Sequence, residues 1–291
     1  MTPHLLVFGP GYAASPIIES ASKAGWRVTA ACRSAATTEA LLASGTEVVD
    51  SEAGCLPDGA GVSHILNSAA PGKEGDPMLA RWSGWLGKQK QVRSIHYFSS
   101  TNVYGDHGGS WVDESTPAIP SLERGKRRVE AEVAWQRQAG LTGARLFIYR
   151  LAGIYGPGRN ALLSVKEGKA RRVIKEGQVF GRIHVDDIAA AVWNALTGES
   201  RGGVFNLTDD MPCPPQEVIE AAAAMLGLEP PQAVLFEDAD LSPLGRSFYL
   251  ENKRVGNDKV KAELGLRLRY PSYREGLGAL LQTMETDTDR A

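Results

Sequence analysis

The chain has 291 residues, of which 43% are hydrophobic and 23% are charged, and its formal net charge is −2. This composition suits one large α/β domain, or one domain with a smaller lobe, and it gives no electrostatic case for nucleic acid or a membrane surface as a partner. The three scattered cysteines form neither a disulfide framework nor a metal-ligand pattern, so we expect a protein of the reducing cytoplasm without a metal site. No apolar run is long enough for a membrane span or a signal peptide.

The first predicted element is a buried strand, Leu5–Phe8, which runs through a glycine turn into a helix over 13–23. Gly9, Gly11 and Ala14 match the spacing Gly-x-Gly-x-x-Gly/Ala, in which the third, small residue allows the helix to pack closely on the strand. The free N–H groups and the positive dipole end of such a helix suit a pyrophosphate. A simple turn between a strand and a helix is the alternative interpretation.

A second strand is predicted over 27–32, and Arg33 and Ser34 follow it. In NAD-binding units an acidic residue at this strand end binds the ribose 2′-hydroxyl, and a carboxylate there would repel a 2′-phosphate. A guanidinium can instead hold that phosphate with two parallel hydrogen bonds. Arg33 therefore favours NADP(H) over NAD(H) as the cofactor, with a solvated arginine as the alternative.

Strands and helices keep alternating through the first half of the chain, which is typical of a parallel sheet covered on both faces. The small residues Ser68 and Ala69, after Asn67, leave space at the carboxyl edge of the sheet, where ligands bind in such folds. Trp82 and Trp85 are predicted to lie in the core or at a dimer interface. Further strands are expected at 47–50, 64–67, 94–99 and 144–150, and helices at 38–44, 78–90 and from about residue 121.

The second half is less regular. A helix is expected over 188–196, and Asp186 or Asp187 is the natural N-cap for it. The basic stretch Lys166–Lys175 is interpreted as a solvated face. A strand is expected over 204–207 and a helix over 216–226, and the tail over 250–282 mixes short strands and helices.

Four motifs in this order resemble the extended short-chain dehydrogenase/reductase superfamily, also called the NAD-dependent epimerase/dehydratase family. They are the glycine motif, Phe98-Ser99-Ser100-Thr101-x-Val103-Tyr104-Gly105, Ile154-Tyr155-Gly156-Pro157-Gly158-Arg159, and Ile183-His184-Val185-Asp186-Asp187. The resemblance implies a doubly wound parallel sheet of the Rossmann type over 1–155 plus 182–208. A smaller C-terminal substrate lobe is then expected over 156–181 plus 209–285.

The chain departs from this family at its catalytic signature, Tyr-x-x-x-Lys, whose Tyr is the acid or base and whose Lys holds the nicotinamide ribose. Glu132 matches a characteristic family glutamate eight residues after that tyrosine, which places Arg124 in the Tyr position and Arg128 in the Lys position. An arginine stays protonated and cannot exchange a proton at neutral pH. Thr101 keeps the position of the family's catalytic Ser or Thr. Thr101, Arg124 and Arg128 are therefore the catalytic candidates, in an altered acid/base site.

The residues and the resemblance together assign the remaining contacts. The expected cofactor-binding residues are Gly9, Gly11, Tyr12, Ala13, Ala14, Arg33, Ser34, Asn67, Ser68, Ala69, Arg128, Gly153 and Ile154. The expected substrate-binding residues are Arg159, Arg182 and His184, and the pair Lys253-Arg254 is a further candidate clamp for a pyrophosphate. His184 and Tyr155 are also candidate proton donors, although a lone histidine in such a turn is more often structural.

Two functions remain open at this point. The first is an NADP(H)-dependent enzyme related to epimerases and reductases, acting on a small molecule such as a nucleotide sugar. The second is a sensor or regulatory protein that holds NADP(H) without redox chemistry. The family often dimerises through a helix pair corresponding to about 76–90 and 121–138, so a homodimer is also expected.

Overall fold

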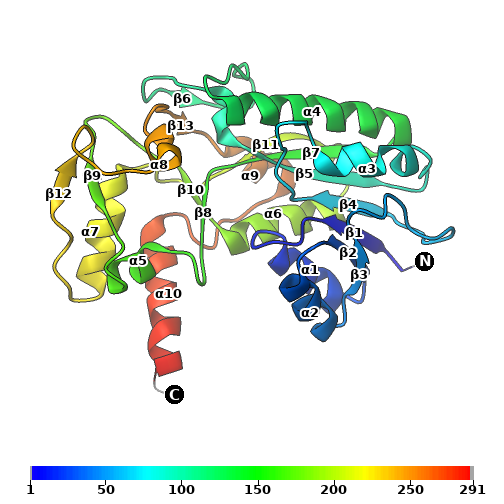
Figure 1. The fold of residues 1–291 in the computed structure, drawn as a ribbon, viewed down its shortest axis with the longest axis horizontal. Coiled ribbons are helices and arrows are strands. Elements are labelled where there is room, and N and C mark those ends of the chain that lie inside the picture. Colours follow the sequence, from blue (N-terminus) through cyan, green and yellow to red (C-terminus); the bar gives the residue numbers. More distant parts are fainter. Residues whose placement is uncertain (1, 289–291) are drawn as a thin grey trace.

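The computed structural model describes residues 2–288 and contains a seven-stranded sheet in the order β11-β7-β5-β4-β1-β2-β3 (Figure 1). All neighbouring strands are parallel. The chain order reverses between β1 and β4, and such a switch point opens a crevice at the carboxyl ends of the strands. The predicted doubly wound parallel sheet is thus confirmed. Its strands are β1 (His4–Phe8), β2 (Arg27–Cys32), β3 (Glu47–Asp50), β4 (His64–Asn67), β5 (Ser94–Ser100), β7 (Arg145–Leu151) and β11 (Gly203–Leu207).

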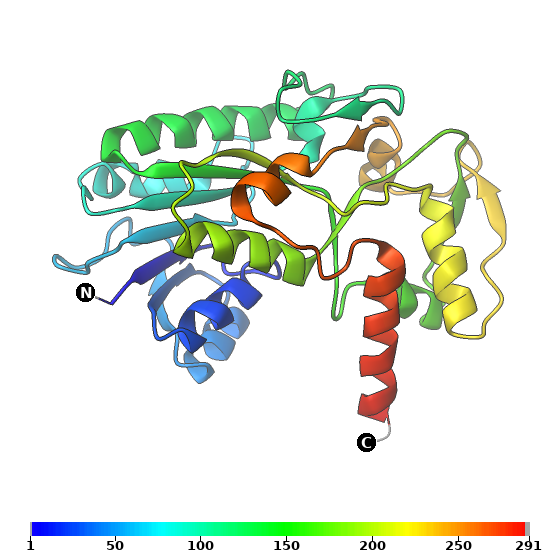
Figure 2. The same ribbon diagram turned by 180° about the vertical axis from the view of Figure 1, so that it is seen from behind.

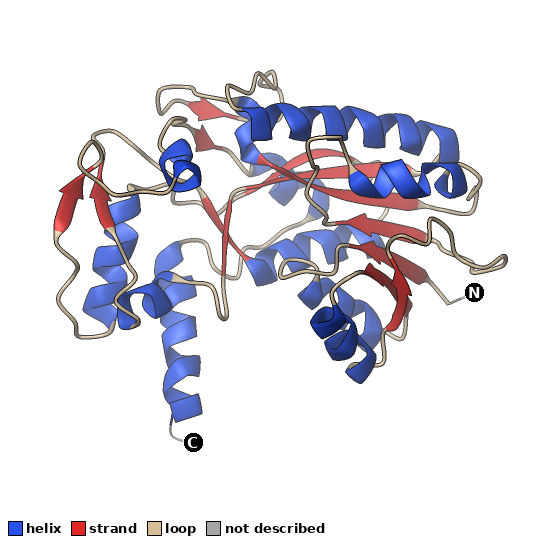
Figure 3. Ribbon diagram, in the orientation of Figure 1, coloured by secondary structure: helices blue, strands red, loops and turns tan. Residues whose placement is uncertain are grey.

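Helices cover both faces of this sheet, because the side chains of β1 alternate between two cores. Leu5 and Val7 pack with α1 (Ser15–Lys23) and α6 (Val185–Thr197). Leu6 and Phe8 pack with α3 (Pro77–Leu86) and α4 (Glu123–Thr142) on the other face. Figures 2 and 3 show these layers from behind and by secondary structure. Helix α2 (Ala35–Ala43) lies beside β2 and β3.

The two tryptophans of α3 differ in their surroundings. Trp82 is fully buried, its ring lies 5.0 Å from that of Phe8, and its Nε1 donates a 2.7 Å hydrogen bond to the carbonyl of Ser51. Trp85 is half-buried beside it. Trp82 therefore belongs to the core of the chain, whereas Trp85 keeps part of its side chain accessible.

The smaller lobe consists of three packed helices with a two-stranded ladder beside them (Figure 1, left). Its helices are α5 (Ala161–Lys166), α7 (Pro215–Met225) and α10 (Tyr273–Thr288). Leu162, Val218 and Leu277 are buried between them. The ladder pairs β9 (Arg172–Ile174) with β12 (Ala233–Leu235), and the short helix α8 (Pro243–Phe248) follows. A further pair, β8 (Gly153–Tyr155) and β10 (Arg182–His184), runs between the lobe and the sheet.

The tail returns to the sheet domain before it ends in α10. β13 (Arg254–Val255) pairs with β6 (Trp111–Val112), and α9 (Asp258–Leu264) packs on α6 and β11. Val260 and Leu264 are buried in the same core as β1. The sequence-based division assigned this segment to the smaller lobe, whereas the structure packs it against the sheet.

The start of α6 also differs from the prediction. The helix begins at Val185, and His184 is its N-cap, since its Nδ1 accepts a 3.2 Å hydrogen bond from the N–H of Asp186. The Asp187 carboxylate instead accepts hydrogen bonds from the N–H groups of Arg269 (2.7 Å) and Tyr270 (3.1 Å). The predicted aspartate cap was wrong, because an imidazole with a free acceptor nitrogen can satisfy the same helix donor.

No helix within residues 2–288 combines the length and the apolar character needed to cross a membrane.

A buried ion pair joins α4 to the centre of the sheet. Arg150 on β7 donates from Nε and Nη2 to the two carboxylate oxygens of Glu132, at 3.1 and 2.8 Å. Ser99 on β5 donates a third hydrogen bond of 2.5 Å to the same carboxylate. The Arg150 guanidinium also lies over the ring of Tyr104, at 4.8 Å. Both charges are therefore paired and hydrogen-bonded, which a buried pair needs in order to be tolerated.

We expect Arg150→Met to lower the free energy of unfolding by about 3–5 kcal/mol, because it leaves the Glu132 carboxylate buried without its counter-ion. Urea unfolding followed by circular dichroism measures this loss. The matched control is Arg27→Met, which removes an equally bidentate contact to Glu47 that is half-exposed and should cost at most about 1 kcal/mol. Equal losses in the two variants would contradict the importance of the buried pair.

Candidate functional site

A glycine turn joins β1 to α1 and presents unpaired backbone donors. Gly9 has a φ of +67°, and a Cβ atom on it would lie 2.9 Å from the backbone nitrogen of Ala69, so this position requires glycine. In the part of the chain that the structure describes, the backbone N–H groups of Tyr12 and Ala13 form no hydrogen bond. They precede the first turn of α1, where the helix dipole is positive. The turn is thus suited to an anionic group such as a pyrophosphate.

A cavity of about 410 Å³ lies beside this turn, and we call it the glycine-turn pocket. Gly9 and Gly11 line it together with Arg33 and Ser34 from the end of β2. The Arg33 guanidinium is exposed and lies 3.8 Å from the Glu52 carboxylate. The Ser34 hydroxyl accepts a hydrogen bond from a backbone N–H of α2 and caps that helix. Arg33 is therefore held by an exposed ion pair, whereas the Ser34 side chain is committed to the helix cap.

A larger cavity of about 800 Å³ also borders this turn, and we call it the central cavity. Ala13 and Ser68 line it next to the turn. The ends of β5 and β7, helix α4 and the segment from α8 to β13 supply its other walls. Thr101, Gly153 and Ile154 all line this space, as the sequence-based assignment requires of site residues. The two cavities together follow the carboxyl edge of the sheet across the switch point.

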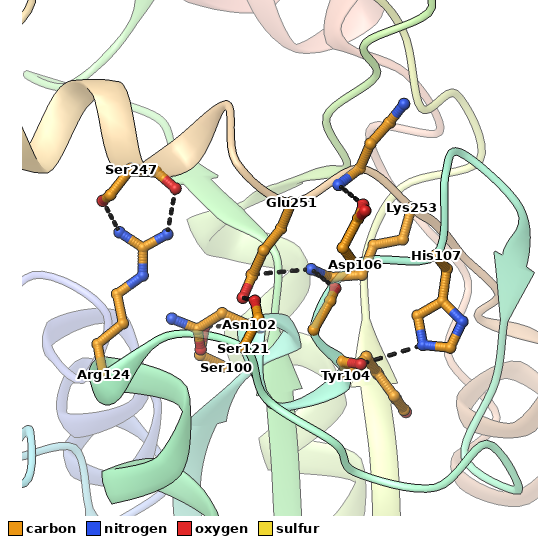
Figure 4. A network of polar contacts seen from close by, with 12 residues as sticks. Ser100, Asn102, Tyr104, Asp106, His107, Ser121, Arg124, Ser247, Glu251 and Lys253 are labelled. Atoms are coloured by element: carbon orange, nitrogen blue, oxygen red, sulfur yellow. Dashed lines mark hydrogen bonds and ion pairs between the residues drawn. The ribbon is translucent and has the colours of Figure 1, made fainter.

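The two arginines of α4 line the central cavity, and each already has protein partners. Arg124 reaches across to α8, where Nη1 donates to the Ser247 hydroxyl at 2.5 Å and the guanidinium lies 4.2 Å from the centre of the Phe248 ring (Figure 4). Arg128 donates from Nη1 to the carbonyl of Phe98 at 2.6 Å and to the hydroxyl of Tyr97 at 3.2 Å. Both therefore place a fixed positive charge in the wall of the cavity.

Asn67 has a different position from the one expected of a cofactor contact. Its side chain is fully buried, donates to the Asp76 carboxylate at 2.9 Å and accepts from the N–H of Ala69 at 3.0 Å. The same Asp76 caps α3 and accepts a hydrogen bond from Trp135. Asn67 thus shapes the turn after β4 and leaves Ser68 to face the central cavity.

Two of the three predicted substrate residues face the cavities. Arg159 and Arg182 line both the central cavity and a neighbouring pocket of about 360 Å³ between α5, α7 and α10. Arg171 lines that pocket as well and was missed, because it lies in the stretch interpreted as a solvated face. We call this space the arginine pocket. No group of three or more His, Cys, Asp or Glu side chains within residues 2–288 is placed to hold a metal ion.

His184 does not line any of these three cavities. It is 1% exposed, and its ring packs against the rings of Tyr155 and Tyr270. Burial lowers its pKa, so the imidazole is neutral near pH 7, which suits its role as a helix cap. The predicted substrate contact is therefore replaced by a structural one.

Glu251 was missed by sequence reasoning, and Lys253 was expected in another role. Both line the central cavity (Figure 4). Lys253 Nζ donates to the carbonyl of Gly105 at 2.6 Å and to the Glu251 carboxylate at 3.1 Å, while Ser121 donates to the other carboxylate oxygen at 2.7 Å. Arg254 does not line the cavity and donates to the carbonyl of Gly109. The i, i+2 spacing of Glu251 and Lys253 was the one sequence signal, since it places both on one side of an extended segment.

No family model matches the chain. Protein YeeZ of Escherichia coli (strain K12) is 27% identical over 283 residues, which cover 91% of this chain and 95% of that protein. A 3-diazoavenalumate denitrifying reductase of a Streptomyces species is 28% identical over 179 residues, covering 58% of this chain and 56% of the reductase.

Two solved structures illustrate the fold. A functionally unknown conserved protein from Silicibacter pomeroyi is 47% identical with a TM-score of 0.91, covering 97% of this chain and 99% of its own. A dTDP-glucose 4,6-dehydratase from Bacillus anthracis, solved in complex with NAD, is 17% identical with a TM-score of 0.77, and the match covers 99% of this chain and 98% of the dehydratase.

Asp209, behind Arg182, should make stability depend on pH. It is 1% exposed, one carboxylate oxygen has no partner among the described residues, and burial raises its pKa to about 7. Between about pH 4 and 7 the folded protein holds a proton that the unfolded chain has lost, so stability falls with rising pH by at most about 1.4 kcal/mol per unit.

Asp209→Asn should remove this pH dependence. The free energy of unfolding of the variant should therefore increase relative to that of the unaltered protein as the pH rises from 4 to 8. Urea unfolding at several pH values measures the difference. Asp210→Asn is the control, because that neighbouring carboxylate is half-exposed and paired with Lys261. A constant difference between Asp209→Asn and the unaltered protein across this range would refute the assignment.

Proposed function

Because the chain has the extended short-chain dehydrogenase/reductase fold of the NAD-dependent epimerases and dehydratases, we propose that it is an NAD(P)(H)-dependent oxidoreductase. Its substrate is a small molecule held in the central cavity. The observation that carries the proposal is the pair of unpaired N–H groups of Tyr12 and Ala13, in a turn whose glycines line the glycine-turn pocket and whose Ala13 lines the central cavity. This arrangement offers one continuous edge for the two halves of a dinucleotide.

In this proposal each half of the cofactor has its own set of residues. The glycine turn holds the pyrophosphate, Arg33 lies at the adenosine ribose, and Ser68, Gly153, Ile154 and Arg128 border the other half. When bound, the nicotinamide supplies or accepts a hydride. We propose NADP(H) as the preferred form, because Arg33 stands at the end of β2 with its guanidinium exposed.

The substrate proposed for this site is anionic, and a nucleotide sugar fits it. Arg159, Arg171 and Arg182 line the arginine pocket, which borders the central cavity. Guanidinium groups bind phosphate and carboxylate oxygens in pairs, so this pocket suits a diphosphate or an acidic group of the substrate. The dehydratase with the same fold acts on dTDP-glucose, as its name states, which supports the same class.

We propose that the acid/base chemistry differs from the Tyr-x-x-x-Lys pattern. The match of Glu132 to the family's glutamate puts Arg124 and Arg128 in the positions of the acid/base pair, and neither arginine can exchange a proton at neutral pH. Their contacts to Ser247 and Phe98 instead fix the cavity wall and its positive charge.

A second candidate function is NADP(H) binding without turnover. It is favoured by the structural contacts that already occupy both arginines. Both functions require the cofactor, and only the oxidoreductase oxidises NADPH when carbonyl compounds are supplied. Stopped or continuous assays at 340 nm with a panel of aldehydes, ketones and nucleotide sugars therefore separate the two functions.

Gly11→Val should abolish NADP(H) binding while the chain stays folded. A Cβ atom at Gly11 meets nothing closer than the Gly9 carbonyl oxygen at 3.9 Å, so the protein accommodates it, but the side chain would occupy the space of the pyrophosphate. Isothermal titration calorimetry measures binding and circular dichroism measures folding. A folded variant that binds NADPH at the original affinity would show that the glycine turn is only a turn.

Arg33→Ala should remove most of the preference for NADPH over NADH. The lost charge-assisted hydrogen bonds to the 2′-phosphate correspond to about 1.5–3 kcal/mol, or roughly a 10- to 150-fold weaker affinity for NADPH. Affinity for NADH should change little. Arg81→Ala is the matched control, because Arg81 binds the same Glu52 at 2.5 Å and does not line the pocket. Equal affinities for both cofactors before substitution would exclude the NADP(H) assignment.

A further inference from the structure

We propose that Lys253 is the proton donor and acceptor of this site, with Glu251 as the residue that positions it. The inference rests on the proposed oxidoreductase function and names the group that replaces the tyrosine. Lys253 and Glu251 line the same central cavity as Thr101 and the end of β5, and they come from the tail rather than from α4. Figure 4 shows both side chains next to the loop that follows Thr101.

The Lys253 ammonium is held in one place by two acceptors. Nζ donates to the Gly105 carbonyl at 2.6 Å and to Glu251 Oε2 at 3.1 Å. The other oxygen of Glu251 accepts the Ser121 hydroxyl at 2.7 Å, so the carboxylate cannot rotate freely. An ammonium carries three N–H donors, and these two bonds leave one for a molecule in the cavity.

The segment that carries Lys253 is attached to the same loop by its backbone. The N–H of Asn252 donates to the Asp106 carboxylate at 2.7 Å. The backbone carbonyl of Asn252 accepts hydrogen bonds from the N–H groups of His107 (2.9 Å) and Gly109 (3.0 Å). This ladder-like attachment fixes Lys253 relative to the loop that begins at Thr101. Such preorganisation is what a group that transfers a proton requires.

The surroundings of Lys253 favour exchange of its proton. Its side chain is 10% exposed, and burial lowers its pKa below that of an ordinary lysine. Three charged groups act on it: Glu251 and Asp106 raise the pKa, and Arg124 lowers it. Burial is the largest of these effects, so the balance makes this ammonium a better acid than a solvated one.

In the proposed step, a carbonyl compound is reduced: a bound dihydronicotinamide would supply the hydride and Lys253 would supply the proton. As a hydride reaches the carbonyl carbon, the C=O π bond breaks, its electron pair moves to oxygen, and an N–H bond of Lys253 breaks while an O–H bond forms. The products are an alcohol, the oxidised nicotinamide and neutral Lys253, which takes a proton from water. Oxidation of an alcohol runs the same steps in reverse. Arg124 and Arg128 cannot donate the proton, because a guanidinium does not release its proton near neutral pH.

A purely structural role is the competing explanation, since a buried ion pair can simply tie the tail to the loop. Lys253→Arg separates the two, because arginine keeps a positive charge and can donate to Gly105 and Glu251 but cannot give up a proton. Lys253→Met removes both roles. Arg254→Met is the matched control, since Arg254 is the next residue, donates to Gly109 of the same loop and does not line the cavity.

The first readout needs no turnover. Reductive methylation with ¹³C-formaldehyde labels the lysines, and NMR titration, with the Lys253 signal assigned by its loss in Lys253→Arg, gives the midpoint for Lys253. We expect a midpoint below those of the exposed lysines, and a still lower one in Glu251→Gln, which removes the carboxylate that raises the pKa. A midpoint equal to that of the exposed lysines would overturn the proposal.

The second readout is the rate of NADPH oxidation with the best carbonyl compound of the panel. Lys253→Arg and Lys253→Met should both lower kcat by about 100-fold or more, the usual size of an acid–base contribution, with NADPH affinity unchanged. The fall in rate at alkaline pH should move to lower pH in Glu251→Gln. Full activity in Lys253→Arg would assign a structural role to the pair.

The two proposals fail in different ways. If neither the unaltered protein nor any variant binds NADPH, the proposed function itself is refuted. Normal NADPH binding combined with an ordinary Lys253 titration refutes the assignment of Lys253 alone.

Discussion

The buried ion pair between Glu132 and Arg150 is the interaction on which the geometry of the central cavity depends. It joins α4 to β7, and the Ser99 hydroxyl adds β5 to the same carboxylate. A shift of α4 along the sheet would break the pair and leave a buried charge without a partner. Such a charge costs several kcal/mol, so the pair holds α4 in its position. The ends of β5 and β7 and the arginines of α4 are thereby held in one arrangement.

Arg124 extends this constraint to the second part of the cavity. It begins on α4 and ends on α8, where it binds Ser247 and stacks on Phe248. The tail then passes Glu251 and Lys253 and returns to the sheet through β13 and α9. The cavity is therefore enclosed by segments that are far apart in the chain, and its polar groups come from all of them.

The charges in the cavity walls divide into two kinds. Arg124, Arg128 and the arginine pocket carry permanent positive charge, which suits binding and orientation of an anionic ligand. Lys253 also lines the central cavity, and burial lowers the pKa of its ammonium below that of an ordinary lysine. In our proposal, ligand binding and proton exchange therefore belong to different residues. In the Tyr-x-x-x-Lys signature of the family, by contrast, the acid/base and the residue that holds the ribose lie on one helix.

The sequence by itself determined the strands of the sheet, the glycine turn and the order of the site segments, because each depends on local periodicity or on the conformation of a few neighbouring residues. The tertiary structure decided that Trp82 is core, that His184 caps α6 and that Asn67 supports a turn. It also decided that Lys253 meets Gly105, 148 positions earlier in the chain. Contacts over such distances depend on how whole elements pack, and no local pattern of residues encodes that packing.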